Sequence, residues 1–532
     1  MITQEDNHQS KIVKLMQKPD FYPHSVDAVT LQETHISRVF LTGEFVYKIK
    51  KPVDLDFLDF TTLEKRRHFC RMEVELNRRL THDIYQDVVS ITKINQSYDL
   101  EGAGKAVEYA VKMKQLPAGS TMARLLTEGQ VDTQSVDQLA QVLAAFYDAA
   151  RSGPKINAAG SWDTVKANCE ENFSQTEEFT GNLIDKRMYQ IIFSASRSFL
   201  QQRKELFERR VKKNKIREGH GDLRTDHIYF TPDGIQIIDC IEFNERFRCG
   251  DIAADLAFLA MDLDFEGYPG IARALLEAYV HHSGDPDVFV LLDFYKCYRA
   301  FVRAKVNCFR LKQSELAERE QVELRRQTQR FVNLAYEYAL QFTHPTVWVV
   351  CGMIASGKST VANALADALQ IKVLHSDVVR KKLFDRQVFE SQEEEFGEGM
   401  YSQDATSLTY GKLLLLAQEE IEQGRSVILD ATFSREDQRR EMLRLVEDRD
   451  ADIVFVECRC REAVIRKRLR NRSKSPAISD ARLRHLEEFK SRYEAPDEIP
   501  PGIKIIVNTE RSLAETVEKI LPQADMPESA KS

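Results

Sequence analysis

Residues 347–360 read VWVVCGMIASGKST, in which an apolar run leads into a loop bounded by two glycines and then into VANALADAL, which has helical composition. The loop fits the pattern G-x-x-x-x-G-K-[ST], whose backbone N–H groups face phosphate oxygens. The helix that follows would add the positive end of its dipole. The stretch therefore predicts a strand, a phosphate-binding loop and a helix, in that order.

The loop defines the first set of candidate site residues, which we expect to bind ATP. Lys358 is expected to reach the β- and γ-phosphates, and the hydroxyl of Ser359 to ligate Mg²⁺. The whole set is Gly352, Met353, Ile354, Ala355, Ser356, Gly357, Lys358, Ser359 and Thr360.

From Thr346 onward, strand-like runs alternate with helical runs. This alternation predicts an α/β three-layer domain, a parallel sheet with helices on both faces, whose ligands bind beyond the carboxyl ends of the strands. Asp430 ends the run SVILD, so it should lie at the same sheet edge as the phosphate loop.

The chain upstream of this domain has a different pattern. Runs rich in β-branched and aromatic residues, broken at Thr42-Gly43, predict a hairpin-rich lobe, and mostly helical patterns follow. This part therefore reads as an α+β bilobal domain. The predicted boundaries are a β-rich lobe at 25–117, a helical lobe at 118–342 (the two forming a domain at 1–342), the P-loop domain at 346–523 and a disordered tail at 524–532.

Composition narrows the class of protein further. With 532 residues the chain needs more than one core, and 43% hydrophobic with 30% charged residues is typical of a soluble protein. The polar N-terminus and the lack of a membrane-length apolar run predict a cytoplasmic protein with no membrane partner. Nine cysteines without a C-x-x-C pair argue against disulfides and zinc. The net charge of −8 argues against broad attraction to nucleic acid, although 204–217 and 459–472 are locally basic.

The segment HGDLRTDHIYF, from His220, and the segment IIDCIEF, around Asp239, identify the first domain. They resemble the catalytic loop and metal-binding segment of the aminoglycoside phosphotransferases and related small-molecule kinases, which share the protein-kinase fold. The resemblance implies that Asp222 accepts the proton of the acceptor hydroxyl and that Asp239 holds Mg²⁺ on the nucleotide. It also implies that Lys48 orients ATP and that Glu73 is the ion-pair partner of Lys48.

Two departures from this family concern the metal and the nucleotide. Five residues after the base, where the family usually has a metal-binding asparagine, this chain has His227, and the hairpin offers Gly43 but no G-x-G-x-x-G. Imidazole suits softer metals than Mg²⁺. His227 at the metal site therefore predicts one of four properties for the first domain. The domain turns over slowly, prefers Mn²⁺, uses Asp226 as a metal ligand instead, or only binds the nucleotide.

A second set of residues surrounds the phosphate loop. The run HSDVVR at 375–380 resembles the polynucleotide-kinase, zeta-toxin and gluconate-kinase-like P-loop kinases. The resemblance implies Asp377 as the base, Arg380 as the holder of an anionic group on the acceptor, and Asp430 as the residue that assists Mg²⁺. The alternative is an ordinary helix N-cap for Asp377 and a solvated Arg380.

The basic run REAVIRKRLRNRSKS, which begins at 461, resembles the lid of the same kinases, whose arginines close over the transferring phosphate. Arg468 and Arg472, four residues apart, are the candidates; a solvated basic helix is the alternative. Together the two halves look like the bacterial fusions called bifunctional aminoglycoside phosphotransferase and ATP-binding proteins.

Three functions remain open from the sequence. The P-loop domain is expected to phosphorylate a small metabolite or nucleotide hydroxyl, with the first domain as a second kinase. Alternatively, it is a nucleic-acid 5′-end kinase, a less favoured acceptor, or a P-loop kinase regulated by a nucleotide-binding first domain.

Overall fold

The computed structural model describes residues 4–55, 57–312, 316–384, 402–447, 449, 451–472, 483 and 486–522. The chain divides into two compact units. The first unit contains Met1–Val165 and Arg210–Ser283, and the second contains Lys166–Arg209 and Gly284–Ser532. The domain boundaries predicted at 342 and 346 stay a prediction.

The first unit contains an antiparallel six-stranded sheet in the order β1-β2-β3-β8-β6-β7. Its strands are β1 (Thr30–Glu33), β2 (Ser37–Leu41), β3 (Phe45–Lys50), β6 (Tyr85–Ile94), β7 (Ser97–Leu100) and β8 (Lys105–Lys114). Helix α1 (Gln4–Met16) shares an apolar cluster with one face, and α2 (Leu63–Asn77) shares a second cluster with the other. The predicted β-rich lobe and its hairpin at Thr42-Gly43 are therefore confirmed.

The buried face of α2 differs from the one that its apolar residues predict. Their spacing marks Leu63, Phe69, Met72, Leu76 and Leu80, of which Leu76 and Leu80 are buried and the other three are partly exposed. Arg66 and Glu73 are buried as well. Buried charges need partners, and Arg66 has Glu108 at 2.9 Å. Hydrophobic spacing alone therefore locates only part of this face, because buried ion pairs lie beside the apolar contacts along it.

The rest of the first unit is largely helical. It includes α3 (Met122–Thr127), α4 (Thr133–Ala149), α5 (Pro154–Ala159), α9 (Glu245–Arg248), α10 (Ile252–Glu266) and α11 (Pro269–Ser283). The short strands β9 (Ile216–Glu218) and β12 (Cys249–Asp251) pair with each other, and β10 (Ile228–Thr231) pairs with β11 (Gly234–Ile237) in a hairpin. In sequence, β9 precedes the candidate catalytic loop and this hairpin follows it.

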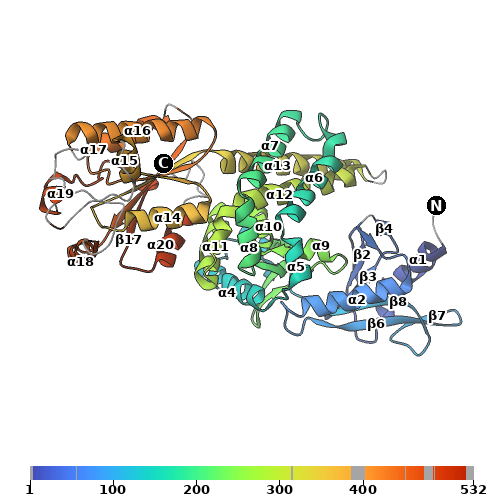
Figure 1. Ribbon diagram of the computed structural model, residues 1–532. Helices are drawn as coiled ribbons and strands as arrows, with labels where there is room; N and C mark the ends of the chain where they lie inside the picture. The colour runs from blue at the N-terminus through green and yellow to red at the C-terminus, as the bar shows by residue number, and fades with distance from the viewer. Residues whose placement is uncertain are drawn as a thin grey trace. The chain divides into compact units, whose positions relative to one another are not determined.

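The second unit carries a five-stranded, wholly parallel sheet in the order β14-β15-β13-β16-β17. The strands are β13 (Thr346–Cys351), β14 (Lys372–His375), β15 (Val427–Asp430), β16 (Asp452–Arg459) and β17 (Lys504–Asn508). Figure 1 shows α16 (Gln403–Glu422) and α17 (Glu436–Glu447) on one side of the sheet, and α14 (Lys358–Leu369) and α20 (Leu513–Ile520) on the other. The predicted fold class, an α+β region followed by a P-loop domain with a parallel sheet and helices on both faces, is confirmed.

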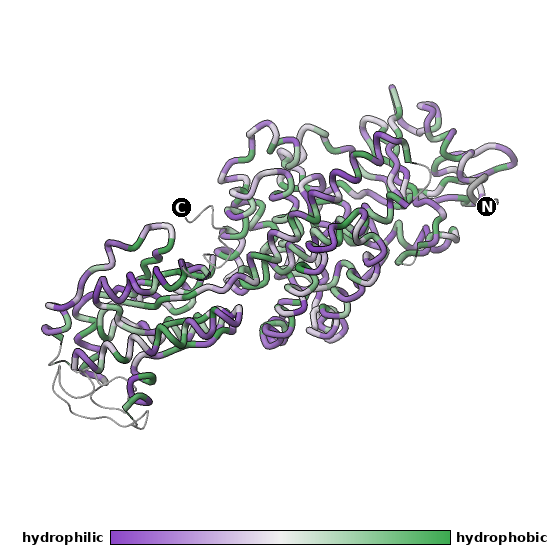
Figure 2. The backbone as a smooth tube through the Cα atoms, turned by 90° about the horizontal axis from the view of Figure 1, so that it is seen from above, coloured by the Kyte–Doolittle hydropathy of each residue, from purple (hydrophilic) through white to green (hydrophobic). Residues whose placement is uncertain are grey.

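The helices of the second unit also include α7 (Lys186–Gln202), α12 (Asp287–Leu311), α13 (Glu318–Thr343), α15 (Ser376–Leu383), α18 (Glu462–Arg472) and α19 (Leu486–Arg492). Figure 2 shows hydrophobic and hydrophilic residues alternating along the helices, as expected where one face of a helix is buried. Helices α6 (Trp162–Thr176) and α8 (Lys204–Lys212) each cross a boundary between the units. Within the described part of the chain, no helix combines the length and apolar character needed to cross a membrane.

Candidate functional site

The first candidate site lies in the first unit and contains Lys48. Strand β3 sets the direction of this side chain, because successive side chains point to opposite faces of a strand. Val46 packs in the cluster that contains α2, whereas Tyr47 packs in the cluster that contains α1. Lys48 therefore faces α2, where its Nζ lies 2.8 Å from Oε1 of Glu73 and 2.5 Å from Oδ1 of Asp239. The structure thus brings together three of the predicted residues, while Glu75, on the same helix as Glu73, is exposed.

Lys48, Glu73 and Asp239 stabilise one another in their charged forms. Burial by itself lowers the pKa of Lys48, but Asp239 and Glu73 raise it well above its ordinary value. Burial raises the pKa of Asp239, yet Lys48 and His227 outweigh it, and the pKa of Asp239 is lowered. Asp239 is thus an ionised carboxylate whose side chain is 42% exposed, and its hard oxygens fit a Mg²⁺ or Mn²⁺ ion.

Lys50 and Glu242 extend this ion-pair group, and the sequence reading missed both. Lys50 lies two residues after Lys48, on the same face, with its Nζ 2.8 Å from Oε2 of Glu73 and in contact with Glu242. Its side chain is 1% exposed. Lys50 could have been identified from VYKIKK, in which it lies two residues after Lys48 and therefore on the same face of the strand.

The candidate catalytic loop is fixed by the start of α10. Oδ2 of Asp255 accepts a hydrogen bond from the backbone N–H of His220 at 2.7 Å, and Oδ1 accepts one from Gly221 at 2.9 Å. Asp255 thus fixes the backbone of the loop at its first two residues. Burial lowers the pKa of His220 to about 4, so its ring is neutral at pH 7. Asp222 follows with a side chain that is 28% exposed.

Next to Asp222 lies Arg224, which the sequence reading did not single out. Its Nε is 3.1 Å from Oδ1 of Asp222, and its other end is 2.9 Å from Nε2 of His227. Nε2 of His227 is also 3.8 Å from Oδ2 of Asp239. Asp222, His227 and Asp239 are therefore neighbours, as predicted, with a guanidinium among them. Asp226, the alternative metal residue, has an Oδ2 that lies 4.0 Å from Arg224 Nη1.

The second site is the phosphate loop between β13 and α14. Gly352 and Gly357 have φ angles of 129° and 101°, which L side chains rarely adopt. A Cβ at Gly352 would lie 2.5 Å from the backbone oxygen of Cys458, so the loop needs glycine there for space as well. The hydroxyl Oγ of Ser356 is buried and has no hydrogen-bond partner among the described residues. A buried hydroxyl without a partner in a loop of this sequence fits a phosphate ligand.

The rest of the loop set is placed at the start of α14. Nζ of Lys358 donates to the backbone oxygen of Met353 at 2.8 Å, and Ser359 and Thr360 are exposed in the first turn. Ile354 and Ala355 are buried. The exposed hydroxyl of Ser359 is available to a metal ion, consistent with the predicted Mg²⁺ ligand.

Three further candidates lie at the carboxyl ends of the neighbouring strands. Asp430 ends β15 opposite His375 of β14, and the His375 Nδ1 atom is 2.8 Å from Oδ2 of Asp430. Asp377 and Arg380 lie on α15, with 3.9 Å between their charged atoms. His375, not Asp377, is the N-cap, and Arg380 is 8% exposed, so the N-cap and solvated alternatives do not describe these two residues.

Arg468 reaches the phosphate loop from α18. Its Nη1 lies 3.3 Å from the oxygen of Ala355 and 3.1 Å from Oγ1 of Thr509, and its Nη2 donates to the Thr509 backbone oxygen at 2.8 Å. Thr509 follows β17 and was not foreseen. The side chain of Arg472, at the end of α18, lies outside the described residues, so the lid prediction for it is open.

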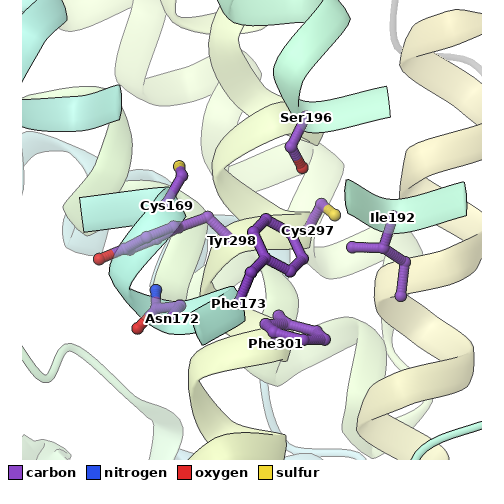
Figure 3. Close-up of a pocket in the computed structure, with 8 residues that line it drawn as sticks. All are labelled: Cys169, Asn172, Phe173, Ile192, Ser196, Cys297, Tyr298 and Phe301. Atoms are coloured by element: carbon purple, nitrogen blue, oxygen red, sulfur yellow. The ribbon is translucent and has the colours of Figure 1, made fainter. Parts of the chain in front are cut away.

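A separate cavity in the helical part of the second unit is too small for a nucleotide. Its volume is about 10 Å³, enough for a single water molecule. Figure 3 shows the side chains that line it, which are Cys169, Asn172, Phe173, Ile192, Ser196, Cys297, Tyr298 and Phe301.

Residues 347–496 match the family model described as "AAA domain". Among solved structures, similarity is found to a choline/ethanolamine kinase family protein from Mesorhizobium loti, with 10% identity, 62% of this chain, 99% of that chain and a TM-score of 0.37. It is also found to the adenylyl-sulfate (APS) kinase CysC of Mycobacterium tuberculosis, with 21% identity, 34% of this chain, 98% of that chain and a TM-score of 0.27.

Curated relatives match most of the chain. Among them are the proteins Rv2004c of M. tuberculosis strain H37Rv and Mb2027c of Mycobacterium bovis, each 31% identical over 430 residues. The match covers 81% of this chain and 83% of each relative. The chain therefore belongs to the same family as these mycobacterial proteins.

Proposed function

We propose that this protein is an ATP-dependent phosphotransferase whose C-terminal P-loop domain transfers the γ-phosphoryl group to a hydroxyl of a small metabolite or nucleotide. The observation that carries the proposal is the grouping at one sheet edge: the loop lysine Lys358, the carboxylates Asp430 and Asp377, and Arg468 of α18, which contacts the loop. A domain that only bound a nucleotide would not need Asp377 beside the buried Arg380.

Each residue has a distinct task in this mechanism. Lys358 and the loop amides hold the β- and γ-phosphates, and Arg468 neutralises charge that develops on the transferring group. Asp377 accepts the proton of the acceptor hydroxyl, while Arg380 holds an anionic group of the acceptor. Ser359 and Asp430 would hold Mg²⁺, which would supply positive charge to the nucleotide phosphates.

The first site is proposed as a second nucleotide site. Lys48, paired with Glu73, would hold the α- and β-phosphates, Asp239 would hold the metal ion, and Asp222 would accept a proton. The buried pairs around Lys48 support the proposal because they keep the lysine charged and oriented.

A small acceptor is favoured over nucleic acid because much of the basic stretch at 204–217 is used inside the protein. Arg210 is fully buried against Asp251 at 2.6 Å. Arg209 donates to the backbone oxygen of Ala368 at 2.9 Å and lies 3.3 Å from Asp287. These cations are not available for phosphate contacts along a strand.

The test is a metabolite-pool screen with γ-labelled ATP on the full chain. We expect label in an organic product with the wild type, loss of that label with Lys358→Ala, and its retention with Asp222→Asn. Loss with Asp222→Asn and retention with Lys358→Ala would assign the transfer to the first site and overturn the proposal.

A further inference from the structure

The His227 ring is held by two partners of fixed hydrogen-bonding character. Its Nδ1 is 2.8 Å from the backbone oxygen of Asp222, which can only accept. Its Nε2 is 2.9 Å from the guanidinium of Arg224, which can only donate. The Nε2 atom, the one that a metal ion would bind, therefore already accepts a hydrogen bond from Arg224.

Arg224 is held from both ends. Its Nε donates to Oδ1 of Asp222 at 3.1 Å, while its other end donates to His227, and its side chain is 18% exposed. Burial lowers the pKa of Arg224, but Asp222 and Asp262 outweigh it and raise the pKa, so the charge is permanent. A divalent ion on Nε2 of His227 would have to displace this guanidinium and would then be repelled by it.

Asp239 offers a separate and compatible metal site. Its side chain is 42% exposed, and its Oδ2 is 3.8 Å from Nε2 of His227, beyond hydrogen-bond distance. An ion bound by Asp239 therefore does not require His227 as a ligand.

We propose that the first site uses one divalent cation, held by Asp239, and that the guanidinium of Arg224 provides the second positive charge, on the terminal phosphate of the nucleotide. This rests on the proposed nucleotide binding by the first site. His227 is then a positioning residue that aims Arg224, and Arg224 contacts the substrate. A guanidinium suits this task because it presents paired N–H donors to phosphate oxygens.

The step that Arg224 would assist is an ordinary phosphoryl transfer. The acceptor oxygen forms a bond to the γ-phosphorus, the bond from that phosphorus to the bridging oxygen breaks, and ADP leaves with the electron pair. The proton of the acceptor hydroxyl moves to Asp222. Arg224 neutralises the equatorial oxygens throughout and exchanges no proton.

Metal stoichiometry tests the proposal directly. The full chain with Lys358→Ala, which disables the second site, is titrated with Mn²⁺ and a non-hydrolysable ATP analogue, and bound Mn²⁺ is counted by electron paramagnetic resonance. We expect one Mn²⁺ per bound nucleotide, and two after Arg224→Gln is combined with His227→Asn. Two ions before these changes would overturn the proposal. Failure to bind any nucleotide would instead overturn the nucleotide role of the first site.

The affinities for an ATP analogue and for ADP provide a second test. They distinguish a phosphate contact of Arg224 from a purely structural role. In the same background, Arg224→Gln should weaken the ATP analogue by about 10-fold while ADP changes by less than about 2-fold, because the lost contact is to the terminal phosphate. Arg187→Gln, at an exposed position of α7, is the matched control and should change neither. Equal weakening of both nucleotides by Arg224→Gln would refute the terminal-phosphate contact.

Discussion

Replacing Lys50 with methionine tests the buried ion-pair group of the first site. The substitution nearly preserves volume but leaves Glu242, 7% exposed, without its cation, and leaves Glu73 with Lys48 alone. Breaking a buried pair by removing one partner costs about 3–5 kcal/mol. Lys48 still serves Glu73, so we expect about 3 kcal/mol, the lower end of that range.

The expected loss depends on pH because Glu242 can take up a proton. Burial raises the pKa of Glu242 even with Lys50 present, and removal of Lys50 raises it further above the value of the unfolded chain. A raised folded-state pKa means that stability increases as pH falls through it, until the unfolded carboxyl is protonated as well. The penalty of Lys50→Met should therefore be largest at pH 8 and should shrink toward the ordinary carboxyl pKa of about 4.3.

Hydrogen exchange followed by mass spectrometry on peptides from β3 and α2 measures this loss locally, since a chain of this size need not unfold in one step. Lys51→Met is the matched control: its Nζ is 2.8 Å from Glu33, whose side chain is 46% exposed, and the expected cost is below about 1 kcal/mol. A penalty for Lys50→Met as small as that of the control, or one unchanged between pH 8 and pH 5.5, would refute the reasoning.

Three further predictions concern the second unit. Gly352→Ala should abolish nucleotide binding at the P-loop, measured by calorimetry, because its Cβ would lie 2.5 Å from the Cys458 oxygen; unchanged affinity would contradict the loop geometry. Arg468→Gln should lower kcat by about 100-fold, with ATP affinity changed by less than about 5-fold, if the arginine acts on the transition state, and equal losses would count against that role. Cys297, whose pKa burial raises, should resist iodoacetamide in the native chain at pH 8 and react after denaturation, as followed by mass spectrometry; rapid native labelling would show that the helical core opens.

The sequence was sufficient for the features that depend on local pattern. The G-x-x-x-x-G-K-S run located the loop, and the alternation of strands and helices gave the parallel sheet, which in turn placed Asp430 opposite His375 at the loop's edge. Lys48 and Glu73 were paired through resemblance to a family, and the alternation of β3 supplies the physical reason for that pairing.

Features that depend on contacts between distant segments could not be predicted in this way. Lys50 finds Glu242 across 192 positions of sequence, and Thr509 meets Ser356 across 153, so no local period signals either contact. Arg224 lies in a recognised motif, yet only the positions of Asp222 and His227 in space show that it holds both. The buried charges of α2 could not be predicted for the same reason, because their partners lie on strands β8 and β3.

The central claim is that the P-loop domain transfers phosphate to an acceptor and does more than bind or hydrolyse ATP. A single-turnover reaction of the full chain with γ-labelled ATP and the product-forming metabolite fraction tests it, comparing wild type with Asp377→Asn. We predict that the wild type places the label in an organic phosphate ester, and that Asp377→Asn binds ATP equally well but loses the transfer. Label found only in inorganic phosphate, or transfer by Asp377→Asn at the wild-type rate, would contradict the account.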